Sequence, residues 1–486
     1  MVTKHYDLLD ANARDLFIAS MRWAEDQWDQ TMGLLWNANN SKTATSIHTI
    51  RGSVWYAFGL LMRNDCGDVA RATRIIDTVL NYQLNAPQRV FHGTFLRAPE
   101  EPFPPDHALI WRDYDPNWRE FIITVLALVL LEYSEQLAPL LIQKIHTAMR
   151  RAVEGALARG LSAAYTNIAL MYAFMLCFAG KRFNDAAWFD EGERMAREVY
   201  RLFKQHDAFA EYNSPTYYGV DFYALALWRS YPTLSPLLAQ LGNEMEATLW
   251  RDVAQFYHAD LRNLAGPYDR SYGMNLLDYV SVIGIWMRLA TNKHIAPFPD
   301  TDQPFEHQHD IGFVPLIAFL GAQVPADALE HFVSFHGERE IEHILADTLR
   351  RVATAWLGKD RMIGAEFTSC TPPQSDQLHP ATIHWRIDRS AKHIGWVRAF
   401  YLEPIDAYAC KNRLEISTTS EIAFLVHAVG TRMDQIERNV WRLPNLVARV
   451  ETNAAEFQIQ ARNGFLEIRY RVATSQPIKC KIVLGR

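Results

Sequence analysis

Residues 112–131 have the sequence RDYDPNWREFIITVLALVLL, in which a polar and aromatic opening leads directly into an apolar run. The same succession recurs along the first part of the chain, with further apolar runs at 54–62, 168–178, 219–228 and 274–287. Helices that are apolar all round are buried in a protein core. We therefore expect an inner ring of core helices whose polar openings gather at one end.

Amphipathic, charged segments lie between the apolar runs, at 8–35, 69–84, 136–158, 187–204 and 235–264. Their apolar residues recur at spacings of three and four, with Arg, Glu, Gln and Asp between them, as in helices with one wet face. A sixth pair is less distinct, with its inner member at about 311–320. The alternation of inner and outer segments predicts a ring of helical hairpins.

The periodicity changes after about residue 360, where short alternating runs replace the helical spacing. These runs lie at 382–387, 394–401, 413–418, 422–429, 447–452, 455–461, 465–472 and 479–484. Alternation with a period of two, with turn residues between the runs, is typical of antiparallel strands, and about eight of them suit a sandwich. We expect a mainly α protein with a β domain, in which helices between 326 and 357 complete the helical part.

Length and composition agree with this organisation. The chain has 486 residues, more than one hydrophobic core usually holds, so two domains are expected. The formal net charge of −6 provides no basic field for a nucleic-acid partner. No dinucleotide fingerprint follows a predicted strand and no P-loop is present, so we expect no cofactor.

Cysteine spacing and hydropathy favour a cytoplasmic protein. Five cysteines are scattered without a Cys-x-x-Cys pair, as expected for reduced, mostly buried thiols. Residues 1–7 lack the apolar core of a signal peptide. The nearest candidate for a membrane span, 122–131, is shorter than the roughly 18 residues that a span requires. We expect no membrane partner, and the oligomeric state stays open.

A ring of helical hairpins followed by an antiparallel β domain resembles the polysaccharide lyases of the heparinase and alginate lyase type, and also several six-hairpin glycosidases. The resemblance is architectural and covers nearly the whole chain. It implies an (α/α)6 toroid at 1–357 and a C-terminal antiparallel β-sandwich at 358–486. It also implies a carbohydrate-active enzyme that binds an oligosaccharide across the mouth of the toroid.

The resemblance implies roles for particular residues as well. In such lyases an Asn, Gln, Arg or His neutralises the uronate carboxylate, and a Tyr or His moves the protons. Asn213 with Tyr217 or Tyr218 is similar to that pattern, and so is Arg270 with Tyr272. Asn213 and Arg270 are then substrate-binding candidates, and the three tyrosines are catalytic candidates.

The chemistry of β-elimination favours the same residue types. Removal of the proton next to a carboxylate requires that the charge developing on that carboxylate be stabilised. Arginine binds a carboxylate in a planar fork. Further substrate-binding candidates in the polar openings are Arg51, Arg119 and Asn167. Each tyrosine also fits a core aromatic whose hydroxyl has one partner.

Glycoside hydrolysis requires instead two carboxyl groups that flank the bond, about 5–5.5 Å apart for retention and about 6.5–9.5 Å apart for inversion. Glu211 and Asp269 are the candidate acid and base. Asp115 is a further substrate-binding candidate. Asp115 and Asp269 also fit N-terminal helix caps, because each lies at or just before a predicted helix start.

Histidines and tryptophans add three candidates. His48 precedes Arg51 by three residues, which places both on one face of a helix, and it is a catalytic candidate. Trp118 offers a flat apolar face to a sugar ring, although it also fits a packed core. His307 and His309 could bind a metal as a pair, but no further ligands appear at a recognisable spacing, so we expect no metal.

Three functions remain open. The first is a lyase that cleaves uronate-containing oligo- or polysaccharides by β-elimination. The alternatives are a glycoside hydrolase with paired carboxylates in the same mouth, and a cyclase or isomerase of a lipophilic intermediate. In each case we expect one cavity to be lined by residues that open inner helices of the same direction: His48, Asp115, Asn167, Glu211 and Asp269.

Overall fold

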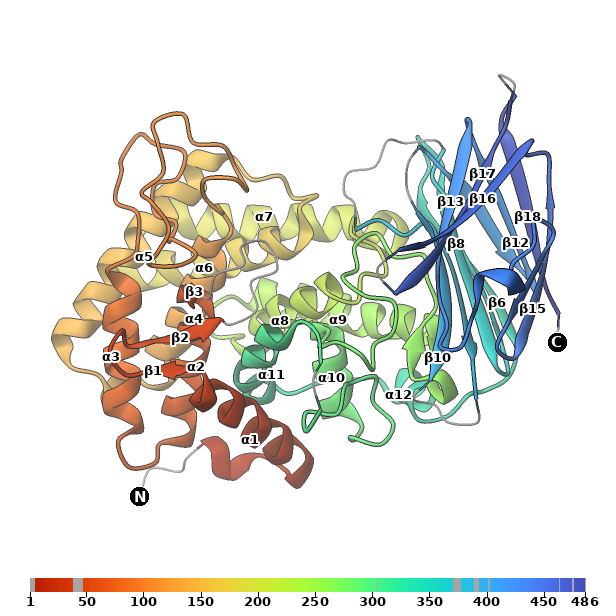
Figure 1. Ribbon diagram of the computed structural model, residues 1–486. Coiled ribbons are helices and arrows are strands. Elements are labelled where there is room, and N and C mark those ends of the chain that lie inside the picture. Colours follow the sequence, from red (N-terminus) through yellow and green to blue (C-terminus); the bar gives the residue numbers. More distant parts are fainter. Residues whose placement is uncertain are drawn as a thin grey trace. The chain divides into compact units, whose positions relative to one another are not determined.

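The computed structural model describes residues 5–37, 47–303, 305–369, 377–388, 393–400, 403–462, 464–473 and 476–485. A helical region precedes a region of antiparallel sheets (Figure 1), so the expected fold class is confirmed. The helices are α1 (Ala11–Asp26), α2 (Ile50–Arg63), α3 (Asp68–Leu80), α4 (Trp118–Glu132), α5 (Pro139–Arg159), α6 (Thr166–Phe183), α7 (Ala186–His206), α8 (Tyr217–Ser230), α9 (Pro236–Phe256), α10 (Val282–Ala290), α11 (Val314–Leu320) and α12 (Ala326–Val333).

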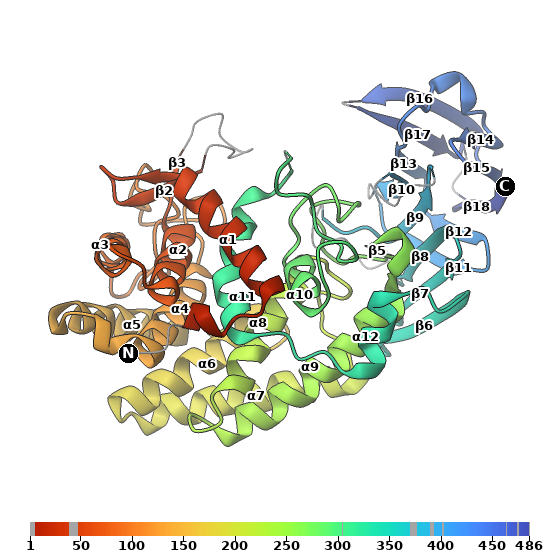
Figure 2. The same ribbon diagram turned by 90° about the horizontal axis from the view of Figure 1, so that it is seen from below.

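Helices α2, α4 and α6 are buried along nearly their whole length, as their apolar sequences predict. Helix α4 packs against both α2 and α6. The more polar helices α3 and α5 lie against α2 and α4, on their outer side (Figure 2). The expected alternation of inner and outer helices is therefore present from α2 to α6.

The segment predicted as one helix over 8–35 contains a turn and two strands after α1. Strands β1 (Trp28–Asp29), β2 (Leu34–Asn37) and β3 (Ile47–Thr49) form a small antiparallel sheet. The Asp29 carboxylate accepts the N–H groups of Thr31 and Met32, which closes the turn before β2. Gly33 then takes a φ of +71°, a conformation that ends a helical path.

Two other helices begin or end at residues different from those predicted. Helix α9 ends at Phe256 and not at 264, because the chain continues into β4 (Tyr257–His258) and β5 (Asn263–Leu264). The apolar run that begins at 274 becomes helical only at Val282. The Asn263 side chain donates to the carbonyl of Met274 and accepts the N–H of Leu276, which holds this stretch in a loop.

The helical region ends earlier than predicted. Between 326 and 357 only α12 is helical, and it is followed by strands, so the helix expected up to 357 is wrong there. Strand β7 is buried at nearly every position, which removes the alternation by which a strand is recognised in a sequence. The strands of the two larger sheets are β6 (Arg339–Ala346), β7 (Arg351–Gly358), β8 (Arg361–Phe367), β9 (Ala381–Arg386), β10 (Ile394–Phe400), β11 (Asp406–Cys410), β12 (Arg413–Thr418), β13 (Glu421–His427), β14 (Val440–Leu443), β15 (Leu446–Thr452), β16 (Glu456–Arg462), β17 (Phe465–Arg471) and β18 (Ile478–Gly485).

These strands form two antiparallel sheets with one shared core. Among the described residues, one sheet has the order β16-β17-β13-β10-β9-β8-β7-β6 and the other β11-β12-β18-β15-β14. Trp356 and Trp385 of the first sheet belong to the same buried cluster as Trp441 and Ile482 of the second. The C-terminal region is therefore a β-sandwich, as expected.

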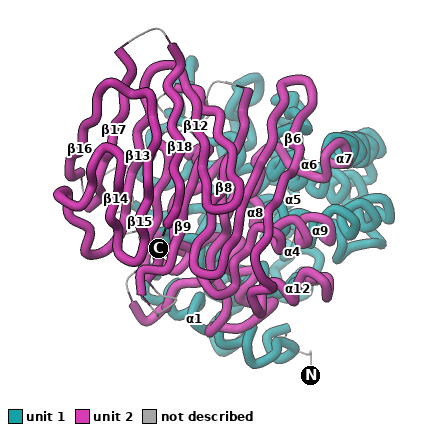
Figure 3. The backbone as a smooth tube through the Cα atoms, turned by 90° about the vertical axis from the view of Figure 1, so that its right-hand side faces the viewer, with its two compact units in different colours: residues 1–202, 220–246, 307–322 teal, residues 203–219, 247–306, 323–486 magenta. Residues whose placement is uncertain are grey.

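The chain divides into two compact units, coloured separately in Figure 3. Unit 1 comprises Met1–Leu202, Val220–Glu246 and His307–Ala322. Unit 2 comprises Phe203–Gly219, Ala247–Glu306 and Gln323–Arg486, so it combines the sandwich with two earlier segments. The domain boundary at 357/358 stays a proposal.

Two smaller expectations concern membranes and thiols. No helix in the described part of the chain is both long and apolar enough to cross a membrane. Cys66, Cys177, Cys410 and Cys480 are free thiols, and two of them, Cys177 and Cys480, are buried. Burial raises the pKa of the Cys480 thiol to about 12, so it stays protonated. Cys370 lies outside the described residues.

Candidate active site

Two loops of unit 2 are joined at the start of α8, where several of the predicted site residues lie. The Ser214 hydroxyl accepts the N–H of Tyr217 at 3.0 Å, which caps the helix. The same hydroxyl donates to the carbonyl of Arg270 at 2.5 Å. The residues around 211–218 and those around 268–273 are therefore held together by a helix cap.

The side-chain amide of Asn213 supports this junction. Its amide nitrogen donates to the carbonyls of Ala265 and Pro267, both at 2.8 Å, on either side of Gly266. The side chain is 1% exposed, and its backbone has a positive φ of 48°. The Asn213 amide was expected to bind a substrate, but it is already hydrogen-bonded to the loop that carries Arg270. Its contacts position that loop.

Arg270 is the centre of the junction. Its guanidinium donates to Glu211 Oε1 at 2.5 Å, to the Tyr217 hydroxyl at 2.6 Å and to Gln377 Oε1 at 3.1 Å. Its Cζ atom also lies 3.9 Å from the centre of the Tyr217 ring. Burial acts to lower the pKa of Arg270, but Tyr217 and Glu211 outweigh it and the pKa is raised. The group is a permanent, half-buried cation.

A second tyrosine extends this contact toward solvent. The hydroxyls of Tyr217 and Tyr272 are 3.1 Å apart, and Tyr272 is 39% exposed. Burial, and then the neighbouring Tyr272, raise the pKa of Tyr217, so this phenol keeps its proton at neutral pH. Because Arg270 already donates to the Tyr217 oxygen, the Tyr217 proton is available to the oxygen of Tyr272.

Tyr218 does not join this group. It is 0% exposed, and its ring packs against those of Phe209 and Tyr212, with centres 6.5 Å and 6.2 Å away. The sequence left Tyr217 and Tyr218 as alternatives. The structure brings Tyr217, and not Tyr218, to Arg270 and Tyr272.

Asp269 forms an ion pair with Arg351 and not with Arg270. Its carboxylate accepts the N–H of Tyr212 at 3.0 Å and two contacts from Arg351 Nη2, at 3.0 and 2.9 Å. Arg351 also donates to the fully buried Glu366 at 2.7 Å. Burial, followed by the charge of Asp269, raises the pKa of Glu366 well above its usual range. The carboxylates of Asp269 and Glu211 therefore have different arginine partners.

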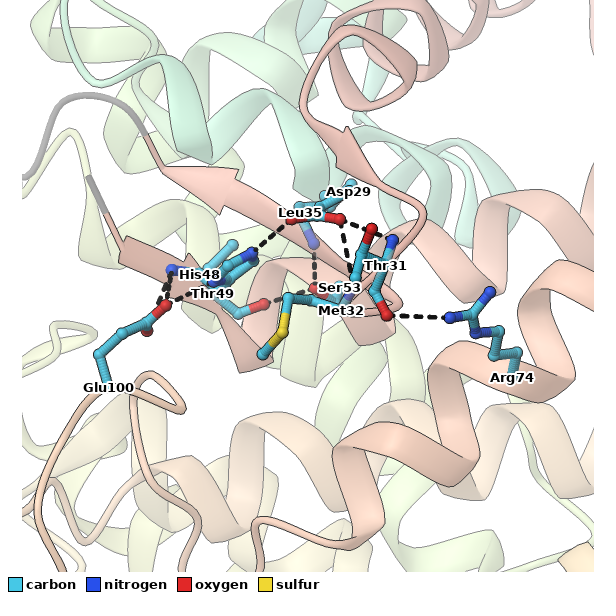
Figure 4. A network of polar contacts seen from close by, with 9 residues as sticks. All are labelled: Asp29, Thr31, Met32, Leu35, His48, Thr49, Ser53, Arg74 and Glu100. Atoms are coloured by element: carbon cyan, nitrogen blue, oxygen red, sulfur yellow. Dashed lines mark hydrogen bonds and ion pairs between the residues drawn. The ribbon is translucent and has the colours of Figure 1, made fainter.

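The candidates of unit 1 form a separate group, in which His48 is 3% exposed and lies on strand β3 (Figure 4). Its Nδ1 lies 2.5 Å from Glu100 Oε1 and its Nε2 lies 3.2 Å from Asp29 Oδ2, so both ring nitrogens contact carboxylates. The Trp36 ring covers it at a centre distance of 4.1 Å. His48 was expected on a helical face with Arg51, but it precedes the Thr49 cap of α2 and connects β3 to Asp29 of strand β1 and to Glu100.

The openings of α2, α4 and α6 do lie together within unit 1. Arg51, in the first turn of α2, lies 5.3 Å from the Trp118 ring at the start of α4. The side-chain amide of Asn117, the residue just before α4, donates to the Tyr165 hydroxyl at the start of α6 at 2.8 Å. Asn167 follows in the first turn of α6 and is 1% exposed.

Asp115 and Arg119 have contacts within the loop that precedes α4. The Asp115 carboxylate accepts the N–H of Asn117 at 2.9 Å, and burial raises the pKa of Asp115. Arg119 is 0% exposed and donates to the backbone carbonyls of His92, Val90 and Pro116. Arg119 is therefore a structural residue of this loop and not an accessible carboxylate ligand.

The predicted site residues thus form two groups, one in each unit. Unit 2 holds Glu211, Asn213, Tyr217, Tyr218, Asp269, Arg270 and Tyr272, and unit 1 holds His48, Arg51, Asp115, Trp118, Arg119 and Asn167. The expectation that both groups line one cavity stays a prediction. Sequence analysis missed Gln377, Asp29 and Glu100. Gln377 and Glu100 lie in loops, Asp29 ends the short strand β1, and none of the three follows a periodic pattern that marks it as a partner of a site residue.

Several solved structures are similar to the chain in fold. Heparinase III has 10% identity and a TM-score of 0.48, with 89% of this chain and 76% of that one covered. Chondroitin AC lyase of Streptomyces coelicolor A3, solved with chondroitin sulphate, has 10% identity and a TM-score of 0.49, with 98% and 79% covered. Endoglucanase CelQ of Clostridium thermocellum, solved with cellobiose and cellotriose, has 8% identity and a TM-score of 0.28, with 98% and 93% covered.

These neighbours are α/α toroid enzymes, and at such identities the resemblance concerns the arrangement of helices and strands alone. No curated protein sequence matches the chain. A family model described as "Domain of unknown function (DUF8769)" matches residues 14–322, which is more than half of the chain, and the chain therefore belongs to that family.

Proposed function

We propose that the protein is a lyase that cleaves uronate-containing oligosaccharides by β-elimination at the Arg270 junction of unit 2. The observation that carries the proposal is the contact series from Arg270 to Tyr217 at 2.6 Å and from Tyr217 to the exposed Tyr272 at 3.1 Å. It combines a half-buried cation, a protonated phenol and a phenol that reaches solvent. These are the groups that elimination next to a carboxylate requires.

Arg270 is assigned to the carboxylate of the substrate. A guanidinium has five N–H donors, and the contacts with Glu211, Tyr217 and Gln377 use three of them. The remaining donors supply the planar contact that a carboxylate prefers. As the proton next to the carboxylate leaves, negative charge develops on the carboxylate, and Arg270 stabilises it.

Tyr272 is assigned to proton transfer, because its hydroxyl is the exposed end of the series. When Tyr272 is ionised, its oxygen accepts a hydrogen bond from the Tyr217 hydroxyl. Arg270 in turn donates a hydrogen bond to the Tyr217 oxygen. The Tyr272 oxygen removes the proton next to the carboxylate, and that C–H electron pair forms the new carbon–carbon double bond. The bond to the leaving oxygen breaks, and this oxygen takes the proton from Tyr272, so no water is consumed.

Glu211 and Asn213 are assigned to positioning. Glu211 accepts from Nη1 of Arg270 and fixes the plane of the guanidinium. Asn213 holds the Ala265 and Pro267 carbonyls and thereby the loop that carries Arg270. Neither side chain is required to transfer a proton in this scheme.

The proposal is tested by incubating the protein with uronate and neutral oligosaccharides while following both new reducing ends and the ultraviolet absorbance of an unsaturated product. New ends with absorbance, on uronate substrates alone, are the expected result. New ends without absorbance would establish hydrolysis instead. Absence of reaction with every sugar would overturn both and favour the lipophilic-substrate alternative.

Variants then assign the site. Tyr272→Phe should lower kcat by about 10²–10⁴-fold, the usual loss on removal of a proton-transfer group. Tyr218→Phe is the matched control, since this neighbouring tyrosine is fully buried and outside the contact series, and it should retain most of the activity. If Tyr272→Phe is fully active and Glu211→Gln is inactive, the residue roles proposed here are wrong.

A further inference from the structure

A short segment of unit 1 brings two imidazoles and a carboxylate together. Ligand atoms of His307, His309 and Asp310 all lie within 4.8 Å of one another. His309 Nε2 and Asp310 Oδ1 are 3.5 Å apart. Two ligands of a tetrahedral zinc ion, each about 2.1 Å from the metal, are separated by about 3.4 Å. The spacing of this pair therefore already suits a shared ion.

The backbone explains how residues so close in sequence can converge. His307 has a positive φ of 51°, and the N–H of Asp310 bonds to the carbonyl of His307 at 3.1 Å. The chain thus turns tightly at the start of the 3₁₀ helix Gln308–Phe313. Sequence spacing did not reveal the third ligand, because Asp310 directly follows His309 and reaches the same point only through this turn.

The segment has a rigid support. The Ser20 hydroxyl of α1 donates to the carbonyl of Ile311 at 2.8 Å. The Phe313 ring stacks on Trp55 of α2, with centres 4.5 Å apart and planes 19° from parallel. Ligands held on a fixed scaffold lose little conformational entropy when a metal binds.

Charge also favours a cation at this point. Asp310 is 7% exposed, and within the described residues its only ion-pair partner is His309. Burial of a carboxylate is costly unless a cation or hydrogen bonds compensate for it. No Lys or Arg in the described part of the chain forms an ion pair with it. A divalent metal ion would supply that charge.

We propose that His307, His309 and Asp310 bind a divalent transition-metal ion of the zinc type. Two imidazole nitrogens and one carboxylate oxygen suit zinc and its first-row neighbours, whereas calcium and magnesium prefer oxygen ligands throughout. Three protein ligands leave a coordination position for water or another ligand. His309 is 39% exposed at its side chain, which gives an ion access from solvent.

The test is titration of the full chain, freed of metal by a chelator, with Zn²⁺ in a calorimeter. One Zn²⁺ per chain is expected, with a melting temperature that rises with Zn²⁺ concentration. His309→Ala should weaken binding by at least about 10–100-fold, the loss that even partners of metal ligands cause. His107→Ala, which removes another exposed histidine of unit 1, should bind Zn²⁺ as the parent does.

Asp310→Asn provides a second variant that keeps the size of the side chain and removes its charge, and circular dichroism checks that it folds. It should also weaken Zn²⁺ binding. If Asp310→Asn fails to fold, the half-exposed His309 decides the outcome. The proposal is overturned if the parent takes up no stoichiometric Zn²⁺, or if His309→Ala binds it with unchanged affinity.

Discussion

Burial separates two arginines that look equivalent in the sequence. Both Arg119 and Arg270 follow aromatic or acidic residues in a polar opening, yet Arg119 is 0% exposed and bonds to backbone carbonyls. Its guanidinium is therefore used to hold the loop before α4. Arg270 bonds to side chains that face the junction of unit 2.

The substitution Arg119→Ala should destabilise the protein by at least about 1–3 kcal/mol, because it leaves the buried His92 carbonyl without its donor. The free energy of unfolding in urea measures this. Arg112→Ala, at a residue whose side chain is 64% exposed, is the control and should stay within about 0.5 kcal/mol of the parent. Equal losses in the two variants would show that the Arg119 contacts carry no stability.

Buried histidines should make unit 2 sensitive to acid. Burial lowers the pKa of His384 to about 4, while its bond to the Met274 carbonyl opposes the change. Between about pH 6.5, the pKa expected in the unfolded chain, and about pH 4, the unfolded state binds more protons, so stability falls as pH falls. At about 1.4 kcal/mol per pKa unit, His384 accounts for a loss of about 3 kcal/mol.

The variant His384→Gln retains an N–H donor for the Met274 carbonyl but does not titrate. The difference in unfolding free energy between parent and variant should therefore be constant above about pH 6.5 and should move in favour of the variant as the pH falls toward 4. Urea unfolding at a series of pH values gives this difference. A difference that does not depend on pH would mean that His384 is not kept neutral by the fold.

Truncation of a leucine in helix α4 should destabilise the protein more when the side chain is more deeply buried. Leu126 lies in its middle at 0% exposure, and Leu131 lies near its end at 38%. Leu126→Ala should cost about 2–5 kcal/mol through the cavity it leaves. Leu131→Ala should cost well under half of that, because water already reaches the side chain. Both substitutions remove the same atoms from the same helix. The difference between the unfolding free energies of the two variants, measured in denaturant, therefore reports the effect of burial.

Strand β8 contains a glycine where a side chain has no room. A Cβ atom on Gly364 would lie 1.8 Å from the carbonyl oxygen of Gly266, on the loop that leads to Arg270. Gly364→Ala should therefore destabilise unit 2 by at least about 1–3 kcal/mol, as overpacking does. On strand β18, a Cβ on Gly485 would meet its nearest atom at 3.4 Å, so Gly485→Ala is the matched control.

Melting temperatures of these two variants test the close approach. Because the displaced loop carries Arg270, Gly364→Ala should also lower activity on any substrate that the parent cleaves, whereas Gly485→Ala should leave it unchanged. If Gly364→Ala has the same melting temperature as the parent, the loop does not lie against β8 in solution.

The division of the chain as a whole depends on where the sheets begin. A fragment of residues 358–486, the β domain predicted from the sequence, lacks β6 and β7 and leaves β8 as an open edge. It also loses Trp356 from the sandwich core. A fragment of 336–486 retains both strands. The shorter fragment should bind more of a hydrophobic dye and associate more strongly, because unpaired edges and apolar surface promote association.

Sedimentation and dye fluorescence of the two fragments check this expectation. The comparison also tests the proposed boundary at 357/358. If the shorter fragment stays monomeric and unfolds as cooperatively as the longer one, the boundary is right and β6 and β7 are dispensable.

The sequence by itself determined the kind and order of most elements in this protein. Burial repeats along an amphipathic helix or a half-buried strand, so α3, α5 and the later strands are visible as periods, and the apolar runs of α4 and α6 are visible as core helices. It also indicated Arg270, Tyr217 and Tyr272 by residue type. The sequence did not reveal strand β7, because burial at nearly every position removes the alternation that marks a strand.

Only the tertiary structure decided which candidates contact one another. Tyr217 and Tyr218 are adjacent in the chain, but one turns to Arg270 and the other into the core. Gln377 reaches Arg270 across more than a hundred residues. Asp310 joins His307 through a single turn. Such contacts depend on backbone turns and on packing between distant segments, which leave no periodic trace in the order of the amino acids.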